Sequence, residues 1–190
     1  MEDLSLHILD IVQNSISAGA SEICIAIIEI QEKNLLDLII QDNGKGIKKE
    51  LIDKITDPFY TSRKTRKVGI GLSLLKQNAE QTGGWLKVES IENYKTVVRA
   101  HFKIDSIDMI PEGNIALTFK TIMSANPEIR LKLFYRFNND TFILDTNEVK
   151  RILGKDIPIN NKEILDYLYK YINQNIKEIK NNNKIQITNN

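Results

Sequence analysis

Apolar residues recur at helical spacing near the start of the chain, and this pattern predicts a helix over residues 3–18. The inward face of that helix consists of Leu4, Ile8, Ile11 and Ser15. Asp3 or Ser5 is suited to cap the start, because a short polar side chain accepts a hydrogen bond from the free N–H groups of the first turn. Gly19 is expected to end the helix, because glycine adopts the left-handed conformation that often follows one.

Two runs rich in β-branched residues follow and predict strands over residues 23–30 and 35–41. The short polar turn between them favours an antiparallel hairpin. The other elements expected before residue 105 are a short helix within 48–55, a loop over 57–71, a helix beginning near Leu72, and two paired strands over 85–90 and 96–104.

The pattern pauses around residues 105–112, which marks a soft boundary. Beyond it the chain predicts a helix over 114–124, strands over 131–137 and 141–145, a short helix over 147–153 and a long helix over 162–179. The stripe of the long helix is Ile164, Leu168, Ile172, Ile176 and Ile179. We therefore expect a first domain over 1–107, a small α/β extension over 108–180, and a polar, disordered tail over 181–190.

Composition restricts the class of protein. Of the 190 residues, 42% are hydrophobic and 27% are charged, which suits one globular domain with an extension. The net charge of +1 provides no field toward nucleic acid or an anionic membrane, so neither is expected as a partner. The single cysteine, Cys24, excludes a disulfide framework and fits a reducing compartment. No apolar run approaches the roughly 18 residues that span a bilayer, and acids stand where a signal peptide has bases. A cytoplasmic location is expected.

Asp10 and Asn14 stand four residues apart in the first predicted helix, so they lie on one face, one turn from each other. A carboxylate and an amide oxygen at that spacing are suited to face a magnesium ion and a water molecule. An ordinary solvated helix face is the alternative, and it is the simpler interpretation of this pair taken alone.

Asp42, Gly44 and Gly46 follow directly on the second strand. A carboxylate at a strand end can accept a hydrogen bond from the exocyclic amine of adenine, whereas guanine has a carbonyl at that position. The glycines would let the backbone approach a flat base. A plain Asp-Asn-Gly turn is the alternative.

Gly69 and Gly71 open the next predicted helix, where free backbone N–H groups and the helix dipole favour phosphate. A basic loop precedes them and consists of Arg63, Lys64, Arg66 and Lys67. A solvated loop that leads into a helix explains both features as well. The chain contains neither a P-loop motif nor a dinucleotide fingerprint.

Taken in order, these four stretches resemble the motifs of the histidine-kinase-like ATPase superfamily, which includes gyrases, heat-shock chaperones, histidine kinases and mismatch-repair proteins. The stretches are IVQNSISAGAS, DNGKGI, DPFYTSRKT and VGIGLSLLKQNAEQTGG. The resemblance covers residues 3–105. It implies a two-layer α/β sandwich of the Bergerat type, with one face of the sheet covered by helices and ATP held on the helical side under a lid.

At the base end of the site, the resemblance implies that Asp42 reads adenine and that Gly44 and Gly46 lie beside the base. Thr96 occupies a late strand, where a threonine near the adenine-binding aspartate is frequent in this superfamily. At the phosphate end, Asn14 matches the magnesium-binding asparagine.

The lid also has counterparts in the superfamily. Thr61 and Arg63 fall where kinases have a threonine and a lysine, and Gly69 and Gly71 match the glycines that join the lid to a helix. Asp10 stands where mismatch-repair ATPases and anti-sigma serine kinases have a glutamate that acts as general base. Aspartate is one methylene shorter.

Because the first motif begins near the N-terminus, we expect a stand-alone module similar to small bacterial ATP-binding proteins of this superfamily. One hypothesis is an ATP-dependent protein kinase acting in trans, or a signalling ATPase, with ATP and Mg²⁺ as cofactors and Asp10 as catalytic residue. The other is a non-catalytic module that binds a protein partner when nucleotide is bound. A homodimer is an open alternative.

Overall fold

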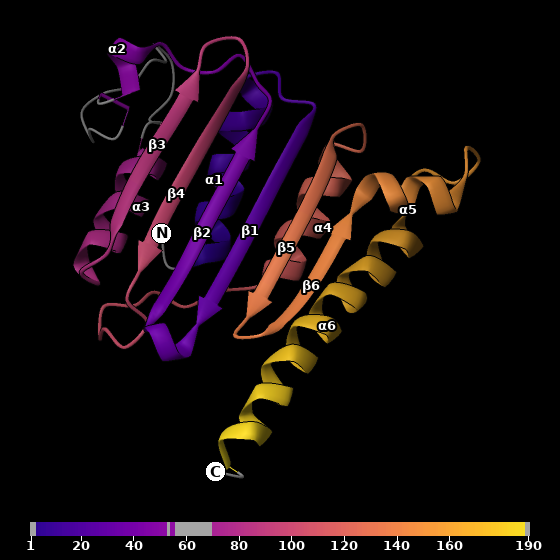
Figure 1. Ribbon diagram of the computed structural model, residues 1–190. Coiled ribbons are helices and arrows are strands. Elements are labelled where there is room, and N and C mark those ends of the chain that lie inside the picture. The colour runs from indigo at the N-terminus through magenta and orange to yellow at the C-terminus, as the bar shows by residue number, and fades with distance from the viewer. Residues whose placement is uncertain (1–2, 53, 56–69, 189–190) are drawn as a thin grey trace.

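Six strands form one sheet in the order β3-β4-β2-β1-β5-β6 (Figure 1). This computed structural model describes residues 3–52, 54–55 and 70–188. The elements are α1 (Leu4–Ser17), β1 (Glu22–Ile30), a 3-10 turn (Gln31–Lys33), β2 (Leu35–Asp42), α2 (Lys49–Ile52), α3 (Ile70–Gln81), β3 (Trp85–Ile91), β4 (Lys95–Phe102), α4 (Ile115–Ala125), β5 (Arg130–Phe137), β6 (Asp140–Asp145), α5 (Thr146–Leu153) and α6 (Lys162–Thr188).

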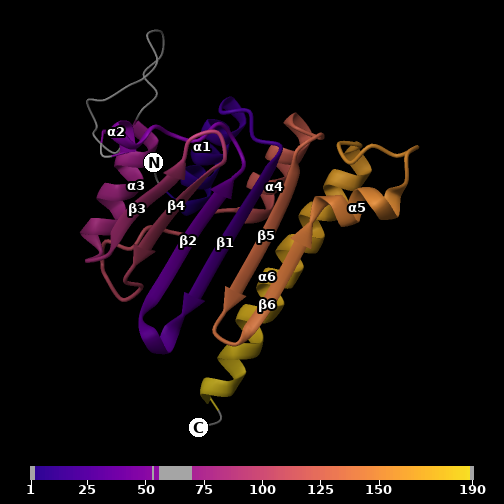
Figure 2. The ribbon, with the colours of Figure 1, turned by 45° about the horizontal axis from the view of Figure 1, so that its top comes forward.

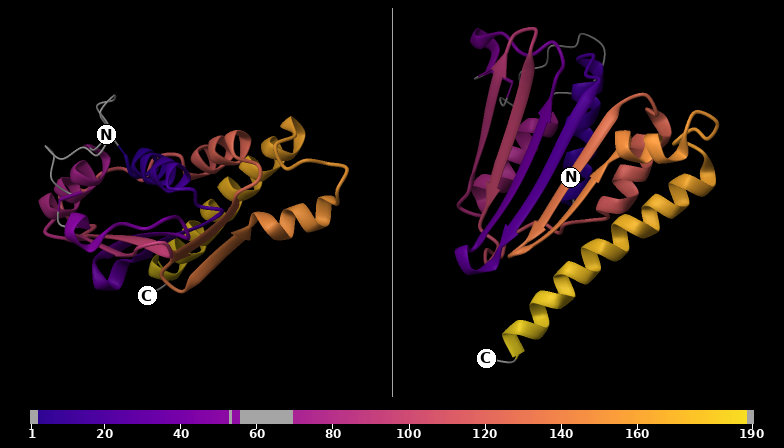
Figure 3. Two further views of the ribbon diagram at one scale, coloured as in Figure 1. Left: turned by 90° about the horizontal axis from the view of Figure 1, so that it is seen from above. Right: turned by 45° about the vertical axis from the view of Figure 1, so that its right-hand side comes forward.

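Helices α1, α3 and α4 lie on one face of the sheet, and no helix of the described part covers the other face (Figure 3). The strands alternate accordingly: Ile23, Ile25 and Ile27 of β1 are buried, while the residues between them are only partly covered. The two-layer α/β sandwich predicted from the sequence is therefore confirmed.

The two predicted strand pairs, β1–β2 and β3–β4, are confirmed, and β5–β6 is a third pair for which no pairing was predicted. β1 pairs antiparallel with β2, β3 with β4, and β5 with β6. The sheet also contains a parallel pair, because β5 lies beside β1 from Arg130 to Phe137. The extension therefore continues the sheet of the first part of the chain, with α4 as the covering helix.

Helix α1 begins and ends where its sequence predicts. Asp3 caps it and accepts a hydrogen bond from the backbone N–H of Leu6 at 2.9 Å. Gly19 adopts a φ of +78°, a left-handed conformation that turns the chain toward β1. The predicted inward face, including Ser15, is buried.

Helix α6 packs against α4 and runs alongside the β5–β6 hairpin (Figure 2). Leu168, Ile172 and Ile176 of its predicted stripe are buried. The helix continues to Thr188, into the segment for which the sequence predicted disorder. A physical reason is that extending a formed helix fixes one residue for each hydrogen bond gained, which costs less than starting a new helix. Among the described residues, no helix combines the length and the apolar character that crossing a lipid bilayer requires.

Candidate functional site

The predicted site residues from four separate segments line one cavity of about 480 Å³ on the helical side of the sheet. The motif residues that line it are Asp10, Asn14, Asp42, Gly46, Gly71 and Thr96. They come from α1, the end of β2, the turn that follows it, the start of α3 and β4. The fold therefore brings together residues that are far apart in the sequence.

Asp42 is the buried anion of this cavity, with 7% of its surface exposed. Its Oδ2 accepts a hydrogen bond from the Ser15 hydroxyl at 2.8 Å, and its Oδ1 accepts one from the Gly44 backbone N–H at 2.8 Å. These bonds fix the orientation of the carboxylate. Each carboxylate oxygen has a further lone pair, so the group can still accept a hydrogen bond from a ligand.

Thr96 lies directly opposite Asp42 in the β2–β4 pair and is likewise buried. Its hydroxyl oxygen is 3.0 Å from that of Ser90, which also accepts a hydrogen bond from the backbone N–H of Ile47. The turn after β2 is thus tied to β3, and the threonine hydroxyl is held beside the aspartate.

The glycines of the turn have no room for a side chain. A Cβ on Gly44 would lie 2.9 Å from Asp42 Oδ1 and 3.0 Å from Ala18 Cβ. A Cβ on Gly46 would lie 2.2 Å from the Ile91 carbonyl oxygen, and its φ of +65° is a conformation that favours glycine. Both glycines are therefore required by the path of the backbone around Asp42.

At the other end of the cavity, Asn14 Nδ2 donates to Asp10 Oδ2 at 3.5 Å, across one turn of α1. The carboxylate also meets the first turn of α3, because a Cβ on Gly71 would lie 1.7 Å from Asp10 Oδ2. Gly71 thus allows the start of α3 to lie against the carboxylate. The cavity also has Lys45 and Lys48 in its wall, which are cations that the sequence analysis did not single out.

Oxygen donors at this end suit a magnesium ion, which usually takes one or two side-chain ligands and completes its shell with phosphates and water. Asn14 and Asp10 provide an amide oxygen and a carboxylate on one helix face. Among the residues that the structure describes, no group of three or more His, Cys, Asp or Glu is placed to hold a metal ion by itself. Asp10 and Asn14 therefore fit a magnesium ion that takes its remaining ligands from a bound molecule and water.

The histidine of α1 is fully buried, with no surface exposed to solvent. Its burial lowers the pKa of His7 from 6.5 to about 4, because the charged imidazolium would lose its hydration. Asn78 of α3 lies against the ring, with its Nδ2 2.8 Å from His7 Nε2. His7 therefore packs between α1 and α3 and does not face solvent.

Three of the predicted site residues, Thr61, Arg63 and Gly69, lie outside the described residues, so their roles stay predictions. Gly44 lies beside Asp42. The sequence analysis placed Ser15 on the inward face of α1 but did not predict its hydrogen bond to Asp42. The one available signal was a polar residue in an otherwise apolar stripe.

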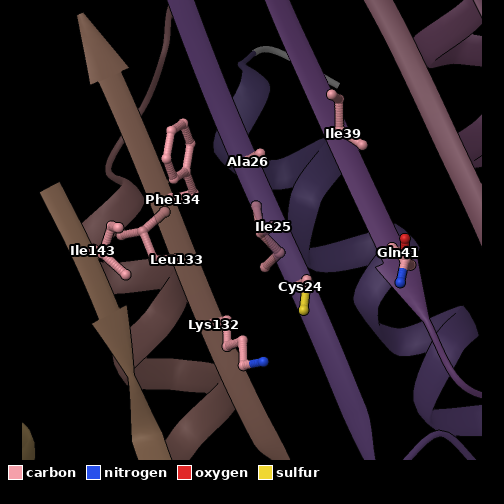
Figure 4. A pocket seen from close by; sticks show the side chains of 9 residues that line it. All are labelled: Cys24, Ile25, Ala26, Ile39, Gln41, Lys132, Leu133, Phe134 and Ile143. Atoms are coloured by element: carbon pink, nitrogen blue, oxygen red, sulfur yellow. The ribbon is translucent and has the colours of Figure 1, made fainter. Parts of the chain in front are cut away.

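A second hollow of about 290 Å³ lies on the opposite face of the sheet, over β2, β1, β5 and β6 (Figure 4). Ala26, Ile39, Phe134 and Ile143 give it a mainly apolar lining. None of the predicted site residues lines it, so the cavity around Asp42 is the candidate site.

Comparison with known families agrees with this assignment. The model of the family described as histidine kinase-, DNA gyrase B-, and HSP90-like ATPase matches residues 2–106, which is more than half of the chain. The matched segment contains α1 to β4 and with them every wall of the cavity.

Curated relatives match over part of this segment. The sensor protein ChvG of Agrobacterium fabrum is 38% identical over 71 residues, which are 34% of this chain and 12% of that protein. A putative NtrY-like sensor histidine kinase of Rickettsia conorii is 25% identical over 109 residues, which are 57% of this chain and 18% of that protein. The chain thus spans less than a fifth of the length of these relatives.

Among solved structures, the N-terminal domain of a DNA repair protein is similar with a TM-score of 0.50 and 16% sequence identity. The similarity covers 76% of this chain and 53% of that chain. At this identity it supports the fold alone.

Proposed function

Because the chain belongs to the family of histidine kinase-, DNA gyrase B- and HSP90-like ATPases, we propose that it binds Mg-ATP in the cavity between α1, α3 and the sheet. Asp42 carries this proposal. It is a buried carboxylate, oriented by two hydrogen bonds, at the wall of a cavity that is large enough for a ligand.

Adenine is the base that Asp42 favours. Its exocyclic amine donates to a carboxylate oxygen, whereas the carbonyl of guanine would face the same anion without a proton between them. Thr96 adds a hydroxyl beside Asp42, and Gly46 lets the backbone come close to the flat ring. Val88 and Val98 provide apolar wall for the base.

The phosphate tail would extend toward Asp10, Asn14 and the start of α3. The backbone N–H groups of a helix start favour phosphate, and the Gly71 contact brings that start to the Asp10 carboxylate. Asn14, with Asp10 beside it, would hold the magnesium ion, and the predicted lid residues Thr61, Arg63 and Gly69 would complete the site. When bound, the ion neutralises charge on the phosphate oxygens.

For the reaction, the proposal is phosphoryl transfer to a partner protein, or hydrolysis in a signalling ATPase. Positioning and charge neutralisation dominate such reactions, so a strong base is not required. Asp10 is the candidate base, because its carboxylate lies at the phosphate end of the cavity and can accept a proton from a hydroxyl, an imidazole or a water molecule.

A specific observation favours a second candidate, a module that binds its partner only when nucleotide is present. The start of α1 is bonded to the extension: the backbone N–H of Leu4 donates to the Pro111 carbonyl at 2.9 Å, and that of Ser5 donates to the Glu112 carbonyl at 3.0 Å. The helix that contributes Asp10 and Asn14 is thus joined to the part of the chain outside the family match. A change at the nucleotide would reach the extension through α1.

Titration calorimetry with ATP and GTP tests the site. We expect ATP to bind in preference to GTP and Asp42→Asn to weaken ATP binding at least about tenfold, because a charge-assisted hydrogen bond is replaced by a facing donor. Asp37→Asn is the matched control, since Asp37 is on the same strand but pairs with His101 on the other face. ATP affinity that is unchanged in Asp42→Asn would contradict the proposal.

Radiolabelled ATP separates the two candidates. Label on a partner protein, or phosphate release that Asp10→Ala abolishes, supports the enzyme. Tight ATP binding without turnover supports the binding module.

A further inference from the structure

A hydrogen bond joins the buried His7 of α1 to the partly buried Asn78 of α3. His7 lies on α1 one turn before Asp10, and Asn78 lies on α3 two turns after Gly71. Asn78 Nδ2 is 2.8 Å from His7 Nε2, and the imidazole has no exposed surface. Both partners therefore belong to the same two helices that form the phosphate end of the cavity.

The chemistry of this bond leaves a donor without a partner. An amide nitrogen can only donate, so His7 Nε2 accepts and the ring proton resides on Nδ1. Nδ1 is buried and has no hydrogen-bond partner among the described residues. An unpaired buried donor destabilises the folded state, so two apolar side chains of similar size would serve stability as well or better. Stability alone therefore does not account for the pair.

The geometry of the cavity suggests what the pair does. The start of α3 lies directly against the Asp10 carboxylate, where Gly71 leaves no space for a side chain. Apolar packing is non-directional and lets helices shift along each other, whereas a hydrogen bond fixes distance and angle. We propose that the His7–Asn78 bond is a positioning device that holds α3 against α1, so that the first turn of α3 faces the phosphate tail. This inference rests on the proposed nucleotide site.

A positioning role has a signature that a purely structural role lacks. Asp42, Gly46 and Thr96, which would hold the base, come from β2, β4 and the turn after β2, and not from α3. A shift of α3 would therefore weaken contacts to the phosphates and spare those to adenine. The ratio of the dissociation constants for adenosine and ATP reports this difference.

The experiment compares wild type with the double variant His7→Leu/Asn78→Leu and with Asn78→Ala, each titrated with ATP and with adenosine in the presence of Mg²⁺. We expect ATP binding to weaken roughly three- to tenfold, as for a lost hydrogen bond, and adenosine binding to change less than about twofold. The double variant should unfold at the same temperature as wild type or higher.

Two further variants complete the design. His7→Gln keeps a polar group near Asn78, so it should retain more ATP affinity than the double variant. Ile8→Val shortens a fully buried side chain of the same helix, so it should lower the unfolding temperature and leave both dissociation constants unchanged.

The outcomes separate the two claims. If wild type binds ATP but the variants change ATP and adenosine binding by the same factor, or change neither, the positioning role is overturned and the nucleotide site stands. If wild type binds no adenine nucleotide, the proposed function falls and the positioning role falls with it.

Discussion

At the scale of single residues, the candidate base-binding end is organised around the Asp42 carboxylate. Ser15 and the Gly44 backbone each donate to one of its oxygens. The sequence predicted the aspartate and the glycine, because their spacing after a strand is local information. The Ser15 contact was not predictable, because it depends on how α1 crosses the end of β2.

Removal of the Ser15 hydroxyl tests this orientation. We expect Ser15→Ala to reduce ATP affinity about three- to tenfold and to lower the free energy of unfolding by about 1 kcal/mol, because a buried carboxylate oxygen loses its donor. Calorimetry and urea unfolding measure the two effects. Ser124→Ala, at an exposed position of α4, is the control and should change neither. Equal behaviour of the two variants would contradict the role of Ser15.

At the scale of elements, local periodicity predicted the helices and strands, but it carried no prediction of where the extension lies against the first part of the chain. The three hairpins follow from short turns between neighbouring strands. The parallel pairing of β5 with β1 joins segments more than a hundred residues apart, so no local pattern could indicate it. The contacts of α6 are also non-local: Lys180 and Glu112, for example, are 68 residues apart.

Glu112 joins β5 to α6 and offers a test of how α6 is held. Its Oε2 accepts hydrogen bonds from the buried Tyr135 hydroxyl of β5 and from Lys180 Nζ of α6, each at 2.6 Å. We expect Glu112→Ala to lower the free energy of unfolding by about 1–3 kcal/mol, because the Tyr135 hydroxyl is left buried without an acceptor.

Urea unfolding measures this effect. Glu32→Ala is the matched control, because Glu32 is exposed in the turn between β1 and β2, and it should stay within about 0.5 kcal/mol of wild type. If Glu112→Ala is as stable as the control, the Glu112 contacts contribute nothing to holding α6.

At the scale of the whole molecule, the candidate ATP-binding part and the extension share one hydrophobic core. Ile25 and Leu38 from the first part and Leu133, Phe119 and Ile172 from the second belong to a single buried cluster. The division into domains at residue 107 stays a prediction, and the shared sheet is the reason to expect that the two parts unfold together. A perturbation in α1 should therefore appear in global stability.

The buried His7 provides such a perturbation through pH. The pKa of His7 is lowered from 6.5 to about 4 in the folded protein by burial, so between these values the unfolded chain binds a proton that the folded chain does not. Falling pH therefore favours unfolding. Above pH 6.5 the titration of His7 does not lower the free energy of unfolding. Between pH 6.5 and pH 4 it lowers the free energy of unfolding by about 3 kcal/mol.

Urea unfolding of wild type and of His7→Leu/Asn78→Leu at pH 7 and pH 4 isolates this contribution. Glu29 acts in the opposite direction in both proteins, since burial raises its pKa and the folded state takes up its proton first. Because Glu29 and the other carboxylates are common to the two proteins, their effects cancel in the difference. Wild type should lose about 3 kcal/mol more than the double variant. Equal losses would mean that His7 does not stay neutral in the folded protein. The positioning role, which requires a buried neutral imidazole at His7, would then be contradicted.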